Sequence, residues 1–167
     1  PHFFPPRFIV FTKTQRENRG EKMNQWYRYY RRLADRTRNY HHNKAVSAFC
    51  YQNLAPLAPN RESQVLLDKF MTEEKAHAFA LGRLYQQLTG KPVPSCSIPP
   101  VAFASYPEGL RQRLWAESTA FLQYSEEFLS APDHYLRRLF YRLGAVAVQH
   151  ALCLSAFHPP EGTAPKG

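Results

Sequence analysis

The chain has 167 residues, of which 44% are hydrophobic and 14% aromatic, and its formal net charge is +9. This length suits one domain with a core that needs no disulfide or metal staple, and the hydrophobic content excludes a chain that is disordered throughout. The positive charge is compatible with binding to nucleic acid, an anionic membrane or an acidic partner, although a solvated basic surface has the same charge.

The cysteines and the apolar segments indicate which cellular compartment to expect and whether the chain spans a membrane. Cys50, Cys96 and Cys153 form no C-x-x-C pair. An odd number of isolated cysteines fits a reducing compartment better than a disulfide framework, so we expect a cytoplasmic protein. No apolar run approaches the roughly 20 residues that a membrane-spanning helix requires. The sequence therefore predicts no transmembrane segment.

The predicted domain organisation has a tail at each end. Residues 1–22 are expected to be an N-terminal tail or extension, residues 23–158 one helical domain, and residues 159–167 a C-terminal tail. Clusters of proline, glycine and asparagine divide the domain, and the longest connection covers residues 90–107. The predicted helices run from about Asn43 or further upstream to Ala55, from Arg61 to Thr89, from Glu108 to Ser130, and from Asp133 to Phe157.

Apolar residues recur at spacings of three and four in each predicted helix, which is typical of helices packed around a core. Strand signals are nearly absent, so the predicted fold class is an all-α bundle. The inward stripe of the second helix includes Leu66, and that of the third includes Phe121 and Phe128. Polar residues also fall inside these stripes: Lys44 in the first helix, Glu74 and His77 in the second, Glu117 in the third and His150 in the fourth.

The two halves of the domain repeat each other at an offset of 73 residues. Without a gap, Tyr51 aligns with Tyr124, Leu66 with Leu139, and His77-Ala78 with His150-Ala151. Matched apolar, turn and histidine positions favour an internally duplicated helical hairpin over a chance agreement.

The tandem hairpins and the E-x-x-H spacing of Glu74 and His77 resemble the ferritin-like superfamily, particularly its rubrerythrin-like bacterial members. The segments EEKAHAFALGRLYQQLTGKPVP and ESTAFLQYSEEFLSAP are similar to the second and third helices of that family, and the resemblance covers about residues 43–157. It implies a four-helix bundle of two duplicated hairpins with a long crossover, preceded here by a lead-in helix. It also implies a di-iron or dimanganese centre that activates dioxygen or peroxide, or oxidises ferrous iron.

The chain departs from this family pattern at two ligand positions. The first-helix glutamate falls on Lys44, and the second E-x-x-H reads AVQH, with Ala147 in place of glutamate. The remaining candidate metal ligands are Glu74, His77, Glu117 and His150. Two carboxylates do not neutralise two divalent ions, so we expect a partial, degenerate site that is impaired in or lacks di-iron redox catalysis.

This partial metal site has two interpretations. In one, the Lys44 ammonium takes the place of a cation and pairs with Glu74 or Glu117, without metal. In the other, the four ligands hold one iron, manganese or zinc ion. Tyr51 and Tyr124 are expected to pack around the site. A plainer interpretation puts the glutamates at the bundle ends and makes both histidines ordinary core residues.

Two alternative functions follow. A mononuclear metal-binding, or peroxide- or iron-handling, oxidoreductase of rubrerythrin type would need an external electron donor, because no C-x-x-C pairs hold a rubredoxin-type iron. A basic interaction module would bind nucleic acid or an anionic membrane through Arg28, Arg31 and Arg32, which alternate with aromatic residues. A lead-in helix that packs its aromatic side chains on the bundle explains the same segment, and a homo-oligomer is compatible with any of these functions.

Overall fold

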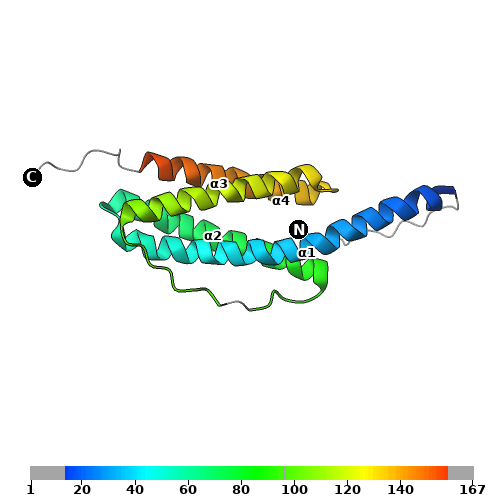
Figure 1. The fold of residues 1–167 in the computed structure, drawn as a ribbon, viewed down its shortest axis with the longest axis horizontal. Coiled ribbons are helices and arrows are strands. Elements are labelled where there is room, and N and C mark those ends of the chain that lie inside the picture. Colours follow the sequence, from blue (N-terminus) through cyan, green and yellow to red (C-terminus); the bar gives the residue numbers. More distant parts are fainter. Residues whose placement is uncertain (1–13, 96, 158–167) are drawn as a thin grey trace, which may run out of the picture.

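The computed structural model describes residues 14–95 and 97–157, with side chains described from residue 26 onward. All regular structure in this part is helical, in agreement with the predicted all-α class. The elements are α1 (Thr14–Leu54), the short 3₁₀ helix η1 (Ala55–Leu57), α2 (Arg61–Thr89), α3 (Tyr106–Ser130) and α4 (His134–Ala156). The four long helices pack in pairs, α1 along α2 and α3 along α4 (Figure 1).

Short polar side chains begin three of these helices. The carboxamide of Asn60 accepts a hydrogen bond from the Ser63 amide, Ser105 accepts one from Glu108, and Asp133 accepts one from Leu136. Each bond satisfies one of the free amide groups that a helix leaves at its N-terminus. The long crossover then runs along the outside of the bundle from the end of α2 to the start of α3 (Figure 1).

The N-terminal helix is longer than the sequence pattern indicates. The predicted lead-in helix and the first bundle helix form one continuous helix of 41 residues. Residues 1–22 were predicted to be a tail or extension, and α1 begins within them at Thr14, so that its N-terminal part extends past the other helices (Figure 1). Residues 1–13 and 158–167, which include the rest of both predicted tails, lie outside the described residues.

The apolar core consists of two clusters along the bundle axis. The cluster near the α3–α4 turn is built around Leu33, Tyr40, Leu81, Tyr124, Phe140 and Leu143. The cluster near η1 is built around Tyr51, Leu54, Leu67, Phe70, Leu110 and Leu154. On every helix, the polar residues singled out by the sequence lie between the members of these two clusters. The bundle therefore has a buried polar layer with apolar packing on both sides.

Three predicted inward positions differ in the structure. Leu66 is half-buried, while its neighbour Leu67 is buried, and Phe121 and Phe128 are 39% and 36% exposed. Arg113 and Glu127 are buried on α3 instead. The pattern of apolar residues does not identify them, because a charged side chain is buried only when a partner compensates its charge, and this pattern does not show such partners. The partner of Glu127 is Arg36 on α1, and that of Arg113 is Glu117 on α3 itself.

One helix has the length and composition of a membrane span. Among the described residues, α4 meets these two criteria, contrary to our expectation that no segment would do so. The core helix of a soluble protein passes the same test. Leu143, Ala147 and His150 of α4 face the interior of the bundle and are almost completely buried.

Gly90 ends α2 in a left-handed backbone conformation, which can be tested by substitution. Gly90 has φ of 72°, and a Cβ atom built on it would meet no other atom within 4 Å. Gly90→Ala should therefore destabilise the fold only through backbone strain, by about 1 kcal/mol. Gly90→Asn should cost less, because asparagine tolerates this conformation. Urea unfolding of the three proteins measures the difference, and an alanine variant as stable as the wild type would contradict the left-handed cap.

Candidate functional site

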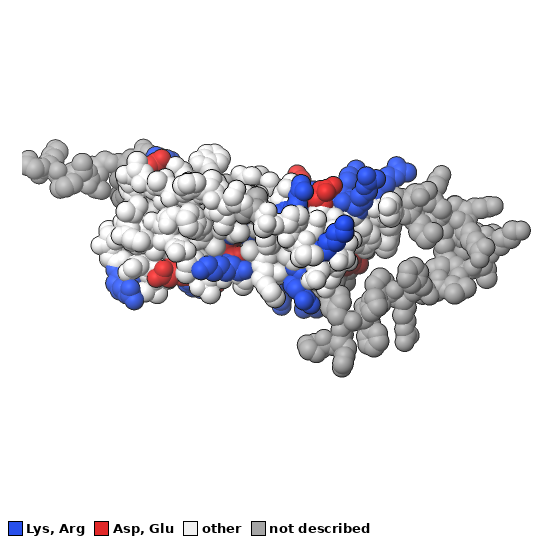
Figure 2. Space-filling view, turned by 90° about the horizontal axis from the view of Figure 1, so that it is seen from below, with Lys and Arg blue, Asp and Glu red and all other residues white. Residues whose placement is uncertain are grey.

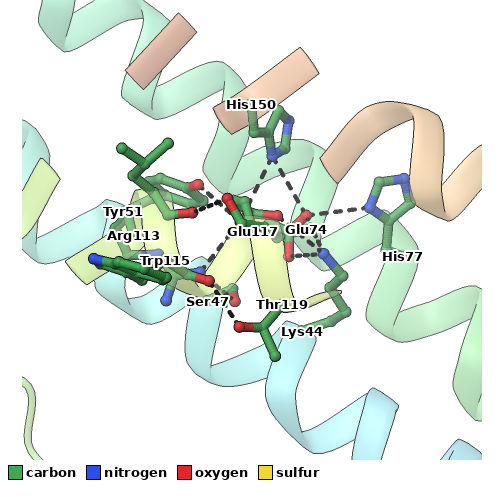
Figure 3. Close-up of polar contacts among 12 residues, drawn as sticks. Lys44, Ser47, Tyr51, Glu74, His77, Arg113, Trp115, Glu117, Thr119 and His150 are labelled. Atoms are coloured by element: carbon green, nitrogen blue, oxygen red, sulfur yellow. Dashed lines mark hydrogen bonds and ion pairs between the residues drawn. The ribbon is translucent and has the colours of Figure 1, made fainter. Parts of the chain in front are cut away.

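Four buried polar residues meet in the middle of the bundle, one from each helix (Figure 3). They are Lys44 of α1, Glu74 of α2, Glu117 of α3 and His150 of α4, and none is more than 2% exposed. The helical spacing of three and four residues turns each of them inward beside the apolar stripe of its own helix. Residues 30 to 106 positions apart in sequence thereby form one polar cluster.

The Lys44 ammonium lies between the two carboxylates. Its Nζ atom is 2.8 Å from Oε2 and 3.0 Å from Oε1 of Glu74, and 3.6 Å from Oε2 of Glu117. It also lies 5.5 Å from the centre of the Tyr124 ring, within the range of a cation–π contact. The first interpretation of the sequence predicted this pairing of Lys44 with a buried glutamate.

Arg113 supplies a second buried positive charge that the sequence analysis did not single out. Its Nη2 atom donates to Ser47 Oγ at 2.8 Å and to Glu117 Oε1 at 3.2 Å. Tyr51, which was predicted to pack around the site, donates its hydroxyl hydrogen to the same Glu117 oxygen at 2.8 Å. Arg113 lies one helical turn before Glu117, and this spacing was the available signal in the sequence.

The charges of this cluster balance without any further ion. Two carboxylates, Glu74 and Glu117, face two cations, Lys44 and Arg113. Burial alone would raise the pKa of Glu117, but His150, Lys44 and Arg113 outweigh it and hold that pKa well below the ordinary value of 4.5. Burial and the charge of Glu117 raise the pKa of Tyr51 well above 10.0, so its hydroxyl stays a hydrogen-bond donor.

His150 is fixed by stacking and by a carboxylate on α2. Its ring stacks on Phe70 with the ring centres 4.0 Å apart, and its Nε2 atom is 2.8 Å from Glu73 Oε2. Because a carboxylate accepts, Nε2 donates the hydrogen bond to Glu73. The Nδ1 atom then faces the cluster, 3.7 Å from Glu74 Oε1 and 3.8 Å from Glu117 Oε1. The sequence analysis singled out Glu74 and not the adjacent Glu73, so it missed this contact.

The remaining predicted positions lie at the margin of the cluster. His77 Nδ1 is 3.3 Å from Glu74 Oε1, but its side chain is 18% exposed and points in from one side (Figure 3). Ala147 is completely buried and offers no ligand atom. Ligand atoms of Glu74, Glu117 and His150 all lie within 4.8 Å of one another, so these three residues form a buried group that could hold a metal ion. The identity of such a metal is not defined by this geometry.

A cavity between α1 and α3 leads to the cluster. Its volume is about 340 Å³, and Lys44, Arg113 and Glu117 contribute to its lining together with Asn43 and Gln123. Asn43 is exposed and Gln123 half-buried. The charged residues border this cavity, but their side chains are almost completely shielded from solvent.

Comparisons with known proteins do not identify a relative. No family model matches the chain, and no curated protein or solved structure matches it. The ferritin-like resemblance therefore rests on the sequence motifs alone.

The lowered pKa of Glu117 predicts how stability depends on pH. A carboxyl whose folded-state pKa is depressed stabilises the fold above its unfolded pKa, and this contribution is lost as the pH falls toward the folded pKa. Glu117→Gln should therefore lose less unfolding free energy than the wild type between about pH 5.5 and about pH 3.5. Urea unfolding at both pH values measures this. Glu126→Gln, an exposed position on the same helix, should behave like the wild type. Equal losses in wild type and Glu117→Gln would contradict the assignment.

Proposed function

We propose that the protein is a ferritin-like bundle in which an internal ion-pair network replaces the dimetal centre, and that it acts as a binding protein without di-iron redox catalysis. The position of the Lys44 Nζ atom, 2.8 Å from Glu74 and 3.6 Å from Glu117, is the observation that supports this proposal most directly. An ammonium held between two buried carboxylates supplies the positive charge that a metal ion would otherwise supply.

The residues present do not fit a pair of divalent ions. Lys44 and Ala147 stand where the family pattern would place two further carboxylates, and Arg113 already contacts Glu117. A second divalent ion would add positive charge beside two buried cations, without a ligand to neutralise it. We therefore assign no reaction step to a dimetal centre in this chain.

A single metal ion is the second candidate, and the geometry of His150 favours it. A metal-binding histidine commonly donates its outer ring N–H to a carboxylate, which orients the other nitrogen toward the metal. The Nε2 atom of His150 contacts Glu73 in this way, while Nδ1 faces Glu74 and Glu117. Together, the two carboxylates and the imidazole would suit iron, zinc or manganese, provided that the Lys44 side chain moves away.

Elemental analysis after anaerobic loading with ferrous iron tests the proposal. Protein purified without a histidine tag should retain no more than trace metal, because the ion pairs already neutralise the carboxylates. Lys44→Glu/Ala147→Glu restores the two missing carboxylates and should bind a pair of ions. Lys44→Gln/Ala147→Gln places neutral side chains of similar size at the same positions and should bind no pair of ions, although the carboxylates that Lys44 no longer neutralises can then hold a single ion with His150.

The wild-type result separates the candidates. About one metal atom per chain, lost in His150→Ala, would overturn the proposal in favour of the mononuclear site. A pair of ions in the wild type would contradict both the metal-free ion-pair network and the mononuclear site. It would favour a dimetal oxidoreductase instead. Circular dichroism of each variant establishes that the helices are retained.

A further inference from the structure

The positive charge of the molecule is concentrated at one end of the bundle. We define the basic end as residues 26–42, 80–95 and 126–142, where the projecting α1, the end of α2 and the α3–α4 turn meet. It contains ten Lys or Arg residues and four Asp or Glu residues, whereas the other described side chains include six of each kind. The entire net charge of the described side chains therefore belongs to this end. Figure 2 shows Lys and Arg gathered there.

Most of these cations are exposed to solvent, although Arg32 and Arg137 each donate a hydrogen bond to a backbone carbonyl group. Arg36 is bound to Glu127, but Arg28, Arg31, Arg32 and Arg38 are exposed. Their spacing places them on one face of α1, opposite the buried Leu33, Thr37 and Tyr40, and Asp35 is the acidic residue within this row. Further exposed cations follow on the neighbouring elements: Arg83, Lys91, Arg137, Arg138 and Arg142.

Interhelical hydrogen bonds hold this arginine face in place. The Tyr30 hydroxyl donates to Asp133 Oδ2 at 3.1 Å, at the start of α4. Arg36 Nη2 donates to Glu127 Oε2 at 3.0 Å, and the Tyr40 hydroxyl donates to the other oxygen of Glu127 at 2.9 Å. These contacts attach α1 to the α3–α4 hairpin where it leaves the bundle. The arginines are thus presented by a fixed backbone, which lowers the entropy lost on binding.

The chemistry of the basic end favours phosphate over other anions. Nine of its ten cations are arginines, whereas the other described cations are three lysines and three arginines. The planar guanidinium donates two parallel hydrogen bonds to a phosphate, which the lysine ammonium does not. Tyr27 and Trp26 are 70% and 47% exposed beside Arg28, and flat exposed rings of this kind stack on unpaired bases.

An anionic membrane fits this surface less well. A helix that lies in a membrane interface inserts a continuous apolar face. The apolar face of α1 is occupied, because Leu33 and Tyr40 are buried in the bundle core. The large exposed apolar side chains described on α1 are those of Trp26 and Tyr27, and they do not form a continuous apolar face.

We propose that the basic end binds nucleic acid, through its phosphate backbone and with unpaired bases stacked on Trp26 and Tyr27. This surface lies outside the buried cluster of Lys44, Glu74, Glu117 and His150, so the inference holds whether or not that cluster binds metal. Binding of this kind is independent of base sequence and weakens as salt rises.

Fluorescence anisotropy with a labelled single-stranded DNA of about 30 nucleotides and mixed sequence tests the proposal on the full chain. The Arg28→Gln/Arg31→Gln/Arg32→Gln variant should bind at least about tenfold more weakly. Its slope of log affinity against log salt should fall by about 2, which corresponds to three lost phosphate contacts. Glutamine is a good helix former, so α1 should persist in this variant.

A matched control separates a local surface from overall charge. Arg61→Gln/Lys75→Gln/Arg111→Gln also removes three positive charges, but from exposed positions outside the basic end, and should change the affinity less than about twofold. Equal weakening of the two variants would overturn the proposal, as would no binding by the wild type at about 50 mM salt. Binding to phosphatidylserine vesicles without binding to the oligonucleotide would also overturn it, in favour of a membrane partner.

Discussion

The need to compensate two carboxylates buried at the centre of a helical bundle constrains the rest of the molecule. Glu74 and Glu117 are at most 1% exposed, and each would be very unfavourable there without a partner. Lys44 and Arg113 supply the opposite charges, and Tyr51 supplies a neutral donor. Removing one member of such a network typically costs about 3–5 kcal/mol, because a buried charge is left alone. The four helices are therefore tied to one relative arrangement.

This polar layer also explains why the apolar core is divided. Leu81, Tyr124 and Leu143 pack on one side of the layer, and Phe70, Leu110 and Leu154 pack on the other. Glu127 is a further buried carboxylate closer to the α3–α4 turn, and it is likewise bound by a cation, Arg36, and a hydroxyl donor, Tyr40. A buried charge paired across helices restricts alternative packings more than apolar contacts do, since a shifted helix would leave the charge unpaired. The centre thus has a structural role even without a metal.

Local sequence signals predicted most of the fold. Clusters of proline, glycine and asparagine placed the limits of α2, α3 and α4 within a few residues, because each signal acts on the backbone nearby. The start of α1 was missed, since the segment from Thr14 carries no apolar stripe. At the site, spacing and the repeat identified Lys44, Glu74, Glu117 and His150. They did not identify Glu127 or the contact of Glu73 with His150, because those depend on side chains of other helices. Arg113 was missed although its partner Glu117 lies four residues further along the same helix.

We propose that an ammonium, and not a metal ion, lies between Glu74 and Glu117. Anomalous diffraction from crystals of the wild-type protein soaked in ferrous, zinc or manganese salts tests it most directly. We expect no anomalous peak among Lys44, Glu74, Glu117 and His150. The Lys44 Nζ atom should lie within hydrogen-bonding distance of Glu74. An anomalous peak at bonding distance from both carboxylates and His150 Nδ1, with the Lys44 side chain displaced, would contradict it.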